Sequence, residues 1–324
     1  MKNIFLGLIL ILLVASSCNN DIKLNANYKE IMVVYGLLDR NDTVHYIRIQ
    51  RAFQNTDATA QSISQKPDSL YYDSLEVKIT DLTTSQVYYL TKDISVIKDS
   101  GYFQNKLNIL YRFTNPINQT HRYRLDIKNI LTGNTAVGET VIVGNPMQVT
   151  GPPGDTFDIL PGKKIYARFR SGINARAYDL FYRFKYDEFD SITGLLKAQK
   201  QIDYYIQRSG LTLSLSGGED LEQMIESEDL IKFIGNAIPV SPGTRRVATF
   251  LDAYYAGSAD DLTVYIDVSK PSIGIVQKKP EFTNVTNGYG VFSSRSVFVK
   301  KHPVNTATQK TLREHAATKN LGWK

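Results

Sequence analysis

Cysteine is nearly absent from this chain, which has a single one, Cys18, among its 324 residues. A chain with one cysteine contains no intrachain disulfide, and the part after residue 18 has neither a thiolate metal site nor a cysteine nucleophile. Histidine is also scarce: the four histidines are widely separated, at positions 45, 121, 302 and 315. Zinc needs roughly three or four converging protein ligands. We therefore predict no metal centre and no cofactor.

Motifs that mark common enzyme classes are missing as well. The chain has no Gly-x-Ser-x-Gly element of a serine hydrolase, and Gly217-Gly218 is not followed by the Gly, Lys and Ser or Thr of a phosphate-binding loop. A Ser-His-Asp triad is assembled in space and has no fixed spacing. A hydrolase with dispersed residues therefore stays an alternative, but we predict that the protein is not an enzyme.

Concentrated positive charge is lacking too. The chain has 38 Lys and Arg against 32 Asp and Glu, and no four basic residues follow one another. The net charge is +6, which becomes +5 without Lys2. Nucleic-acid-binding proteins usually carry a concentrated basic stripe. We therefore predict scattered, solubilising charge and no nucleic-acid partner.

The N-terminal segment has the most informative pattern in the sequence. Lys2 gives a positive start, residues 4–14 are apolar apart from Gly7, and small residues precede Cys18. A short apolar run followed by small residues is typical of a secretory signal and is too short for a permanent membrane helix. Small residues directly before a cysteine resemble the lipobox of bacterial lipoproteins. We predict a signal peptide over residues 1–17, with Cys18 as the lipidated residue.

Lipidation at Cys18 has a physical consequence. One acyl chain anchors a protein only weakly, whereas several chains, palmitate among them, hold it stably at a lipid surface. Residues 18–27 are expected to be a lipidated tether, and no later apolar run is long enough to cross a bilayer. The partner predicted for Cys18 is therefore membrane lipid. The residues alone leave the leaflet open.

The chain after the tether has the pattern of strands. Residues 31–38 are nearly all apolar, residues 39–42 suit a turn, and residues 43–53 alternate, which predicts a hairpin. About seven short strands separated by turns favour an immunoglobulin-like β-sandwich over residues 28–145. The predicted fold class is therefore mostly β.

A Gly- and Pro-rich stretch after residue 143 predicts a domain boundary. Residues 155–300 are expected to form a second β-rich domain. A helical insertion is predicted near residues 218–235, because acidic residues begin this segment and apolar residues recur at helical spacing. Residues 262–268 are expected to be a strand, and residues 301–324 a C-terminal tail with a short helix.

Tyrosine is abundant, with 20 residues, and several tyrosines are adjacent in expected strands. A tyrosine ring has a flat apolar face and a polar hydroxyl, so an exposed ring can stack on a ligand such as a sugar. Adjacent strand residues point to opposite sides of a sheet, so one tyrosine of each pair can be exposed. Ordinary cross-strand packing is the alternative. The candidate ligand residues are Tyr204, Tyr205, Tyr254 and Tyr255.

Three features together resemble a known family. They are the lipoprotein signal, the strand pair at 33–38 and 44–49, and a late motif at 284–292, in which Gly288 and Gly290 allow backbone conformations closed to other residues. They are similar to Bacteroidota lipoproteins of a domain-of-unknown-function family (the DUF four-two-four-nine group). The resemblance implies an N-terminal immunoglobulin-like domain, an outer-membrane setting and a role beside a TonB-dependent transporter. We expect the late motif to be a tight turn and not a site.

Two functions from different classes stay open beside the hydrolase. The one we favour is a non-enzymatic, lipid-anchored outer-membrane lipoprotein, an accessory that binds a ligand or a partner such as a TonB-dependent transporter. The alternative is a structural or adhesive envelope protein whose β-domains act as spacers. A binder is expected to show a deep aromatic pocket, and a spacer is expected to lack one.

Overall fold

The computed structural model describes residues 30–52, 60–99, 101, 104, 106–271 and 281–324. The predicted signal peptide, Cys18 and the tether lie outside these residues. The protein is mostly β, with 47% strand and 15% helix, which confirms the predicted fold class. The immunoglobulin-like order of strands is a finer statement and stays a prediction.

The N-terminal half contains two packed sheets and the predicted hairpin. Strand β1 (Met32–Asp39) pairs antiparallel with β2 (His45–Arg51), and Val34 lies opposite Ile49. The same sheet continues into β6 (Leu110–Phe113) and β5 (Thr91–Asp93). The facing sheet has the order β14 (Val285–Thr286), β8 (Thr135–Val141), β7 (Arg122–Asn129), β3 (Leu75–Asp81) and β4 (Gln86–Tyr89). Two short helices, α2 (Ala60–Ser64) and α3 (Pro67–Leu70), precede β3.

The second half is built on long antiparallel strands. Strand β10 (Ala177–Asp190) lies between β11 (Leu196–Leu211) and β13 (Thr244–Ser258), and β13 pairs with β15 (Gly288–Lys300). A separate ribbon consists of β9 (Lys164–Arg170) and β12 (Asp220–Glu226). The helices are α4 (Ser227–Ala237), α5 (Asp260–Ser269) and α6 (Thr306–Glu314), followed by the short 3₁₀ helix η1 (Lys319–Leu321).

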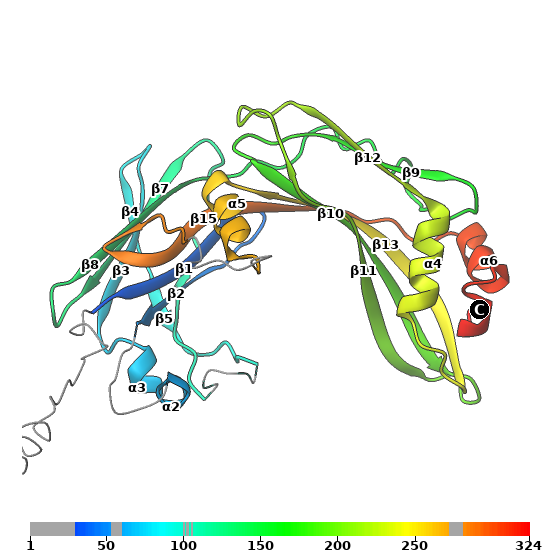
Figure 1. Ribbon diagram of the computed structural model, residues 1–324, viewed down its shortest axis with the longest axis horizontal. Coiled ribbons are helices and arrows are strands. Elements are labelled where there is room, and N and C mark those ends of the chain that lie inside the picture. Colours follow the sequence, from blue (N-terminus) through cyan, green and yellow to red (C-terminus); the bar gives the residue numbers. More distant parts are fainter. Residues whose placement is uncertain (1–29, 53–59, 100, 102–103, 105, 272–280) are drawn as a thin grey trace, which may run out of the picture.

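Strand β15 joins the two halves into one eight-stranded sheet. Its first part pairs parallel with β1, where Val291 lies opposite Tyr35, and its last part pairs antiparallel with β13, where Val299 lies opposite Tyr254. The sheet order is therefore β11-β10-β13-β15-β1-β2-β6-β5. Figure 1 shows the result as an arch whose two lobes are connected by the long strands. The second β-rich segment predicted from the sequence thus supplies strands to the N-terminal sandwich.

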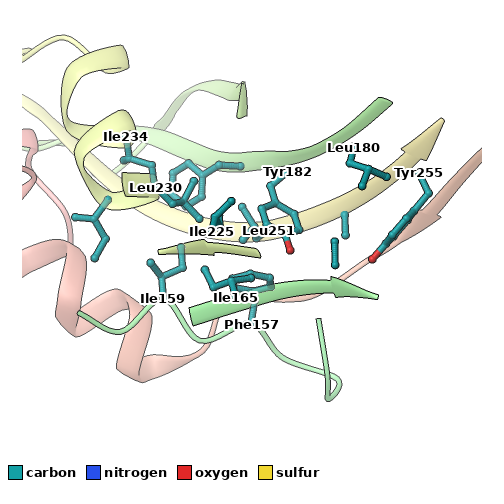
Figure 2. Packing of buried hydrophobic residues seen from close by; sticks show 14 of the residues in the cluster. Phe157, Ile159, Ile165, Leu180, Tyr182, Ile225, Leu230, Ile234, Leu251 and Tyr255 are labelled. Atoms are coloured by element: carbon teal, nitrogen blue, oxygen red, sulfur yellow. The ribbon is translucent and has the colours of Figure 1, made fainter. Parts of the chain in front are cut away.

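Both hydrophobic cores lie on the same face of this sheet. Side chains of a strand alternate between its faces, and the even-numbered residues of β15 point inward: Phe292 belongs to the N-terminal core and Phe298 packs against the second core. In the second half, the sheet residues face the β9–β12 ribbon and the segment before it, as Figure 2 shows for Tyr182 and Leu251 opposite Ile165 of β9 and Phe157. The odd-numbered residues of β15 consequently lie on the other face.

The late motif holds β15 against β1. Gly290 has a φ of +109°, and a Cβ there would lie 2.0 Å from the carbonyl oxygen of Val34, so only glycine fits. Asn284 accepts a hydrogen bond from the Phe292 backbone N–H at 2.9 Å and donates one to its carbonyl oxygen at 2.7 Å. The segments at 33–38 and 284–292, far apart in sequence, therefore lie on neighbouring strands. The late motif is more than a turn, because it forms the seam between the halves.

The predicted helix over residues 218–235 is wrong in its first half. Residues Asp220–Glu226 form strand β12, and the helix α4 begins only at Ser227. The acidic residues do not begin a helix: Asp220 pairs with Arg170 at 2.7 Å and Glu222 pairs with Arg168, both across the strands. Cross-strand pairs of opposite charge stabilise antiparallel strands. Here the pairing of β12 with β9 outweighs the helical spacing of the apolar residues.

The strand expected at residues 262–268 is also wrong. This segment belongs to helix α5, which begins at Asp260. Acidic residues in a first turn interact well with the helix dipole, and Asp260 also pairs with Arg176 at 2.7 Å. The short C-terminal helix is confirmed as α6. Within the described ranges, no helix combines the length and the apolarity needed to cross a bilayer.

Candidate functional site

One face of the eight-stranded sheet points away from both cores. The candidate tyrosines that remain accessible lie on this face. We call it the outer face and define it by Tyr35, Val291, Tyr254, Phe181 and Tyr205, which the register places on one side of the sheet. On β10 the alternation is regular: every second residue from Tyr178 to Tyr186 is buried, and those between are half-buried. Helix α5 packs on this face, where Tyr265 contacts Tyr35 with ring centroids 6.1 Å apart.

Three aromatic rings on neighbouring strands lie in contact at the centre of the second lobe. The ring of Phe181 on β10 stacks on Tyr254 of β13 with centroids 4.5 Å apart and planes at 13°. On its other flank it contacts Tyr205 of β11 at 5.1 Å. The register explains the contact, since both tyrosines lie directly opposite Phe181. Aromatic pairs directly opposite one another stabilise a sheet.

Two guanidinium groups complete this cluster. Arg208 lies over the ring of Tyr205 at 3.7 Å, and Arg183 lies over the ring of Tyr254 at 4.6 Å from its centroid. Cations are attracted to the electron-rich faces of aromatic rings. We call these five residues the aromatic–arginine stack. It is half-buried at its centre, and Tyr205 is 40% exposed at its edge.

Arg183 is held rigidly within the stack. Its Nε and Nη2 atoms donate to the two carboxylate oxygens of Asp203 at 2.7 and 2.8 Å, and Nη1 donates to the hydroxyl of Tyr254 at 3.2 Å. A bidentate arginine–carboxylate pair is geometrically specific and strong. Its hydrogen bond to Asp203 raises the pKa of Arg183 above its already high usual value. The stack is therefore a preorganised surface.

A buried carboxylate lies next to the stack on the same strands. Asp252 of β13 is 1% exposed and accepts a hydrogen bond from Nζ of Lys185 at 2.6 Å through one oxygen. Its other oxygen, Oδ1, has no hydrogen-bond partner among the described residues. A buried carboxylate oxygen without a donor is energetically costly. On this part of the outer face, Oδ1 of Asp252 is therefore an unused acceptor next to the fixed cations of Lys185 and Arg183.

The structure separates the four candidate tyrosines into two groups. Tyr205 and Tyr254 belong to the stack, whereas Tyr204 and Tyr255 point to the core. Tyr204 packs on Phe233 of α4 with centroids 5.1 Å apart, and Tyr255 is 1% exposed with its hydroxyl donating to the carbonyl oxygen of Gly151. Because both rings are used in packing, we remove them from the candidate site. Burial also raises the pKa of Tyr255 above its usual value.

Three members of the stack were missed in the sequence: Phe181, Arg183 and Arg208. The alternation of residues 178–186 signals that Phe181 and Arg183 share a face. Nothing in the sequence places them beside Tyr205 and Tyr254, because that depends on the pairing of β10 with β11 and β13. Cys18, the predicted lipidation site, lies outside the described residues.

The geometry limits what the stack can bind. Each ring is already in contact with another ring or with a guanidinium group, so a sugar stacking on a ring face would have to displace one of them. What remains available is a patch of ring edges with the exposed side chains of Tyr205 and Arg208. Tyrosine and arginine of this kind are enriched in the centres of protein–protein interfaces.

The described residues offer no support for a hydrolytic or metal centre. No three His, Cys, Asp or Glu among them gather as metal ligands. His121 contacts Asp81 at 2.7 Å and His315 contacts Glu228 at 3.2 Å, in separate parts of the molecule.

Comparison with known proteins gives little guidance. No family model and no curated protein matches the chain. Among solved structures, the chain is similar to the C-terminal globular domain of an oligosaccharyltransferase from Pyrococcus abyssi, with 13% sequence identity and a TM-score of 0.21. The match covers 61% of this chain and 38% of that one. A likeness of this degree carries no argument about function.

Proposed function

We propose that the protein is a non-enzymatic, lipid-anchored outer-membrane lipoprotein that serves as a partner subunit of an envelope complex. The observation that carries the binding role is the aromatic–arginine stack, a rigid, half-buried cluster on a sheet face that faces away from both cores. The lipid anchor is inferred from the sequence of residues 1–18. The family resemblance makes a TonB-dependent transporter the expected partner.

The stack favours a protein partner over a small flat ligand. Its exposed members are Tyr205 and Arg208, and Arg183 is already fixed by Asp203 and the Tyr254 hydroxyl. A surface whose side chains are ordered before binding loses little conformational entropy when a partner arrives. A few tyrosine and arginine residues of this kind often carry most of the binding energy of an interface.

The test is affinity purification of the tagged full chain from solubilised membranes of its host, followed by mass spectrometry. We expect wild type to recover a membrane β-barrel protein. The double change Tyr205→Ala and Arg208→Ala is expected to weaken recovery at least tenfold, since loss of an interface hot spot costs about 2 kcal/mol or more. Tyr89→Ala is the matched control, because Tyr89 is a 67% exposed strand tyrosine outside the stack.

Lipid anchoring is tested in the same cells. Wild type is expected to incorporate labelled palmitate and to stay in the membrane fraction, whereas Cys18→Ala is expected to lose the label. Unchanged partner recovery by the stack variant would contradict the proposed interface, and recovery of no membrane protein by wild type would favour the alternative of a structural spacer. An unlabelled wild-type chain would contradict the anchor.

A further inference from the structure

A second feature lies at the N-terminal lobe, at the edge of the outer face that includes Tyr35. A depression of about 410 Å³ opens there, and its polar lining consists of Tyr35, Arg48, Gln50, Arg51 and Lys98. We call it the basic pocket. The described residues that line it include three cations and no carboxylate, although the chain as a whole has nearly balanced charge.

The two arginines of the basic pocket have no acidic partner among the described residues. Many of the other arginines pair with carboxylates, as Arg295 does with Asp39 at 3.5 Å. No ion pair among the described residues involves Arg48 or Arg51; Arg48 reaches only the amide oxygen of Asn108 at 3.5 Å. Arg51 lies over the ring of Tyr72, and its buried Nε has no hydrogen-bond partner in the described part of the chain.

Like charges gather in this pocket at an energetic cost. Burial lowers the pKa of Lys98, and the positive charge of Arg48 lowers it further. The Nζ of Lys98 also donates a hydrogen bond to the carbonyl oxygen of Gln104 at 3.3 Å. A bound anion would relieve the repulsion and would supply acceptors for the donors of both guanidinium groups.

We propose that the basic pocket binds a phosphate group carried on a larger molecule. Several N–H donors that line one pocket suit the oxygens of a tetrahedral, multiply charged anion better than a single carboxylate. The pocket also has apolar walls from Val33 and Leu70, so it offers contacts to the group that bears the phosphate. Two sources fit this chemistry: a lipid headgroup and a soluble phosphate ester.

The position of the pocket is compatible with a lipid source, an assignment that rests on the proposed anchor. Arg51 pairs with Met32, and Ala52 donates a backbone hydrogen bond to Ile31 at 2.9 Å, so the pocket adjoins the start of the described chain. The chain from Cys18 to Glu30 spans at most about 40 Å. An anchored protein can therefore bring this pocket to the headgroups.

The experiment is isothermal titration calorimetry of the full chain in a neutral detergent. The titrants are inorganic phosphate and dihexanoyl phosphatidic acid, at equal ionic strength. We expect saturable binding that Arg48→Gln weakens about tenfold, equivalent to ~1.4 kcal/mol. Arg48→Lys, which keeps the charge, is expected to recover part of the affinity. Arg313→Gln is the control, because Arg313 is exposed on α6.

The titrants distinguish the sources. Tighter binding of the phosphatidic acid assigns the pocket to a lipid headgroup, and equal binding of both assigns it to soluble phosphate esters. Binding of neither, or equal binding by wild type and Arg48→Gln with unchanged thermal unfolding, overturns the proposal. A chain that binds phosphate but recovers no membrane partner would refute only the proposed function, because the two sites share no residue.

Discussion

The two faces of strand β10 carry similar residues in different roles. On the inner face, Tyr182 and Phe184 are almost fully buried in the second core. On the outer face, Phe181 and Arg183 are half-buried and contact the aromatic residues of the neighbouring strands. Both faces contain aromatic residues, so composition does not distinguish core from surface here. The distinction comes from which face the β9–β12 ribbon covers.

The largest expected effect is on stability and tests this contrast directly. Phe184→Ala should lower the free energy of unfolding by about 3–5 kcal/mol, because it leaves a cavity in a closed core. Phe181→Ala, three residues away on the other face, should lower it by about 1 kcal/mol, since it removes mainly cross-strand contacts. Chemical denaturation followed by circular dichroism measures both. Equal losses would mean that the outer face is a second core and not a binding surface.

The next effect concerns the seam that puts both cores on one face. Gly290→Ala should lower the free energy of unfolding by about 2–4 kcal/mol, because a Cβ there collides with the backbone of Val34 and the φ is unfavourable. Gly133→Ala is the matched control: it also has a positive φ, but a Cβ there meets nothing within 4 Å. That control should cost about 1 kcal/mol.

The comparison of the two glycines isolates the close approach of β15 to β1. If both variants lower the free energy of unfolding equally, the loss comes from the unfavourable φ alone. The parallel pairing of β15 with β1 is then not tightly packed. Thermal unfolding that splits into two transitions in Gly290→Ala alone would show the seam failing before the lobes.

The smallest expected effect is a pH dependence of stability, which comes from a histidine buried on the inner face of the sheet. Burial lowers the pKa of His302, and the charge of Lys300 lowers it further. The ring is fully buried against Phe157. The unfolded chain therefore binds a proton more readily than the folded one, and stability should fall as the pH drops below the ordinary histidine pKa of about 6.5.

Denaturant titrations between pH 7.5 and pH 5 measure this decline in wild type and in His302→Gln. The variant should show a shallower decline. The stability of the variant should still decline somewhat, because burial also lowers the pKa of His45 in the N-terminal lobe. An equally steep decline in both proteins would place the titrating groups elsewhere, for instance among the carboxylates.

Local pattern predicted those parts of the fold in which pairing partners are close in sequence. The hairpin of β1 and β2 follows from alternation and a polar turn, and α6 follows from its short periodic segment. The helix predicted at 218–235 is wrong in its first half, because the apolar spacing there also fits a helix. The sequence does not show that β9 lies beside this segment. Arg168 and Arg170 pair with the acidic residues that suggested a helix start. Those arginines are distant in sequence.

The candidate site was predicted only in part for the same reason. Alternation indicates that one tyrosine of each adjacent pair is exposed, and the structure selects Tyr205 and Tyr254. Their shared neighbour Phe181 could not be found, because three strands must be aligned to bring the rings together. The basic pocket was likewise invisible, since Lys98 and the two arginines come from separate segments.

The sequence by itself determined the mostly β character of the chain and the alternation along each strand, since both follow from neighbouring residues. It is also the whole basis of the predicted export signal and of Cys18 as the anchor. Only the tertiary structure decided which side of each strand stays exposed. That choice depends on β15, which pairs with β1 and β13 at once, and such long-range pairing leaves no local signature.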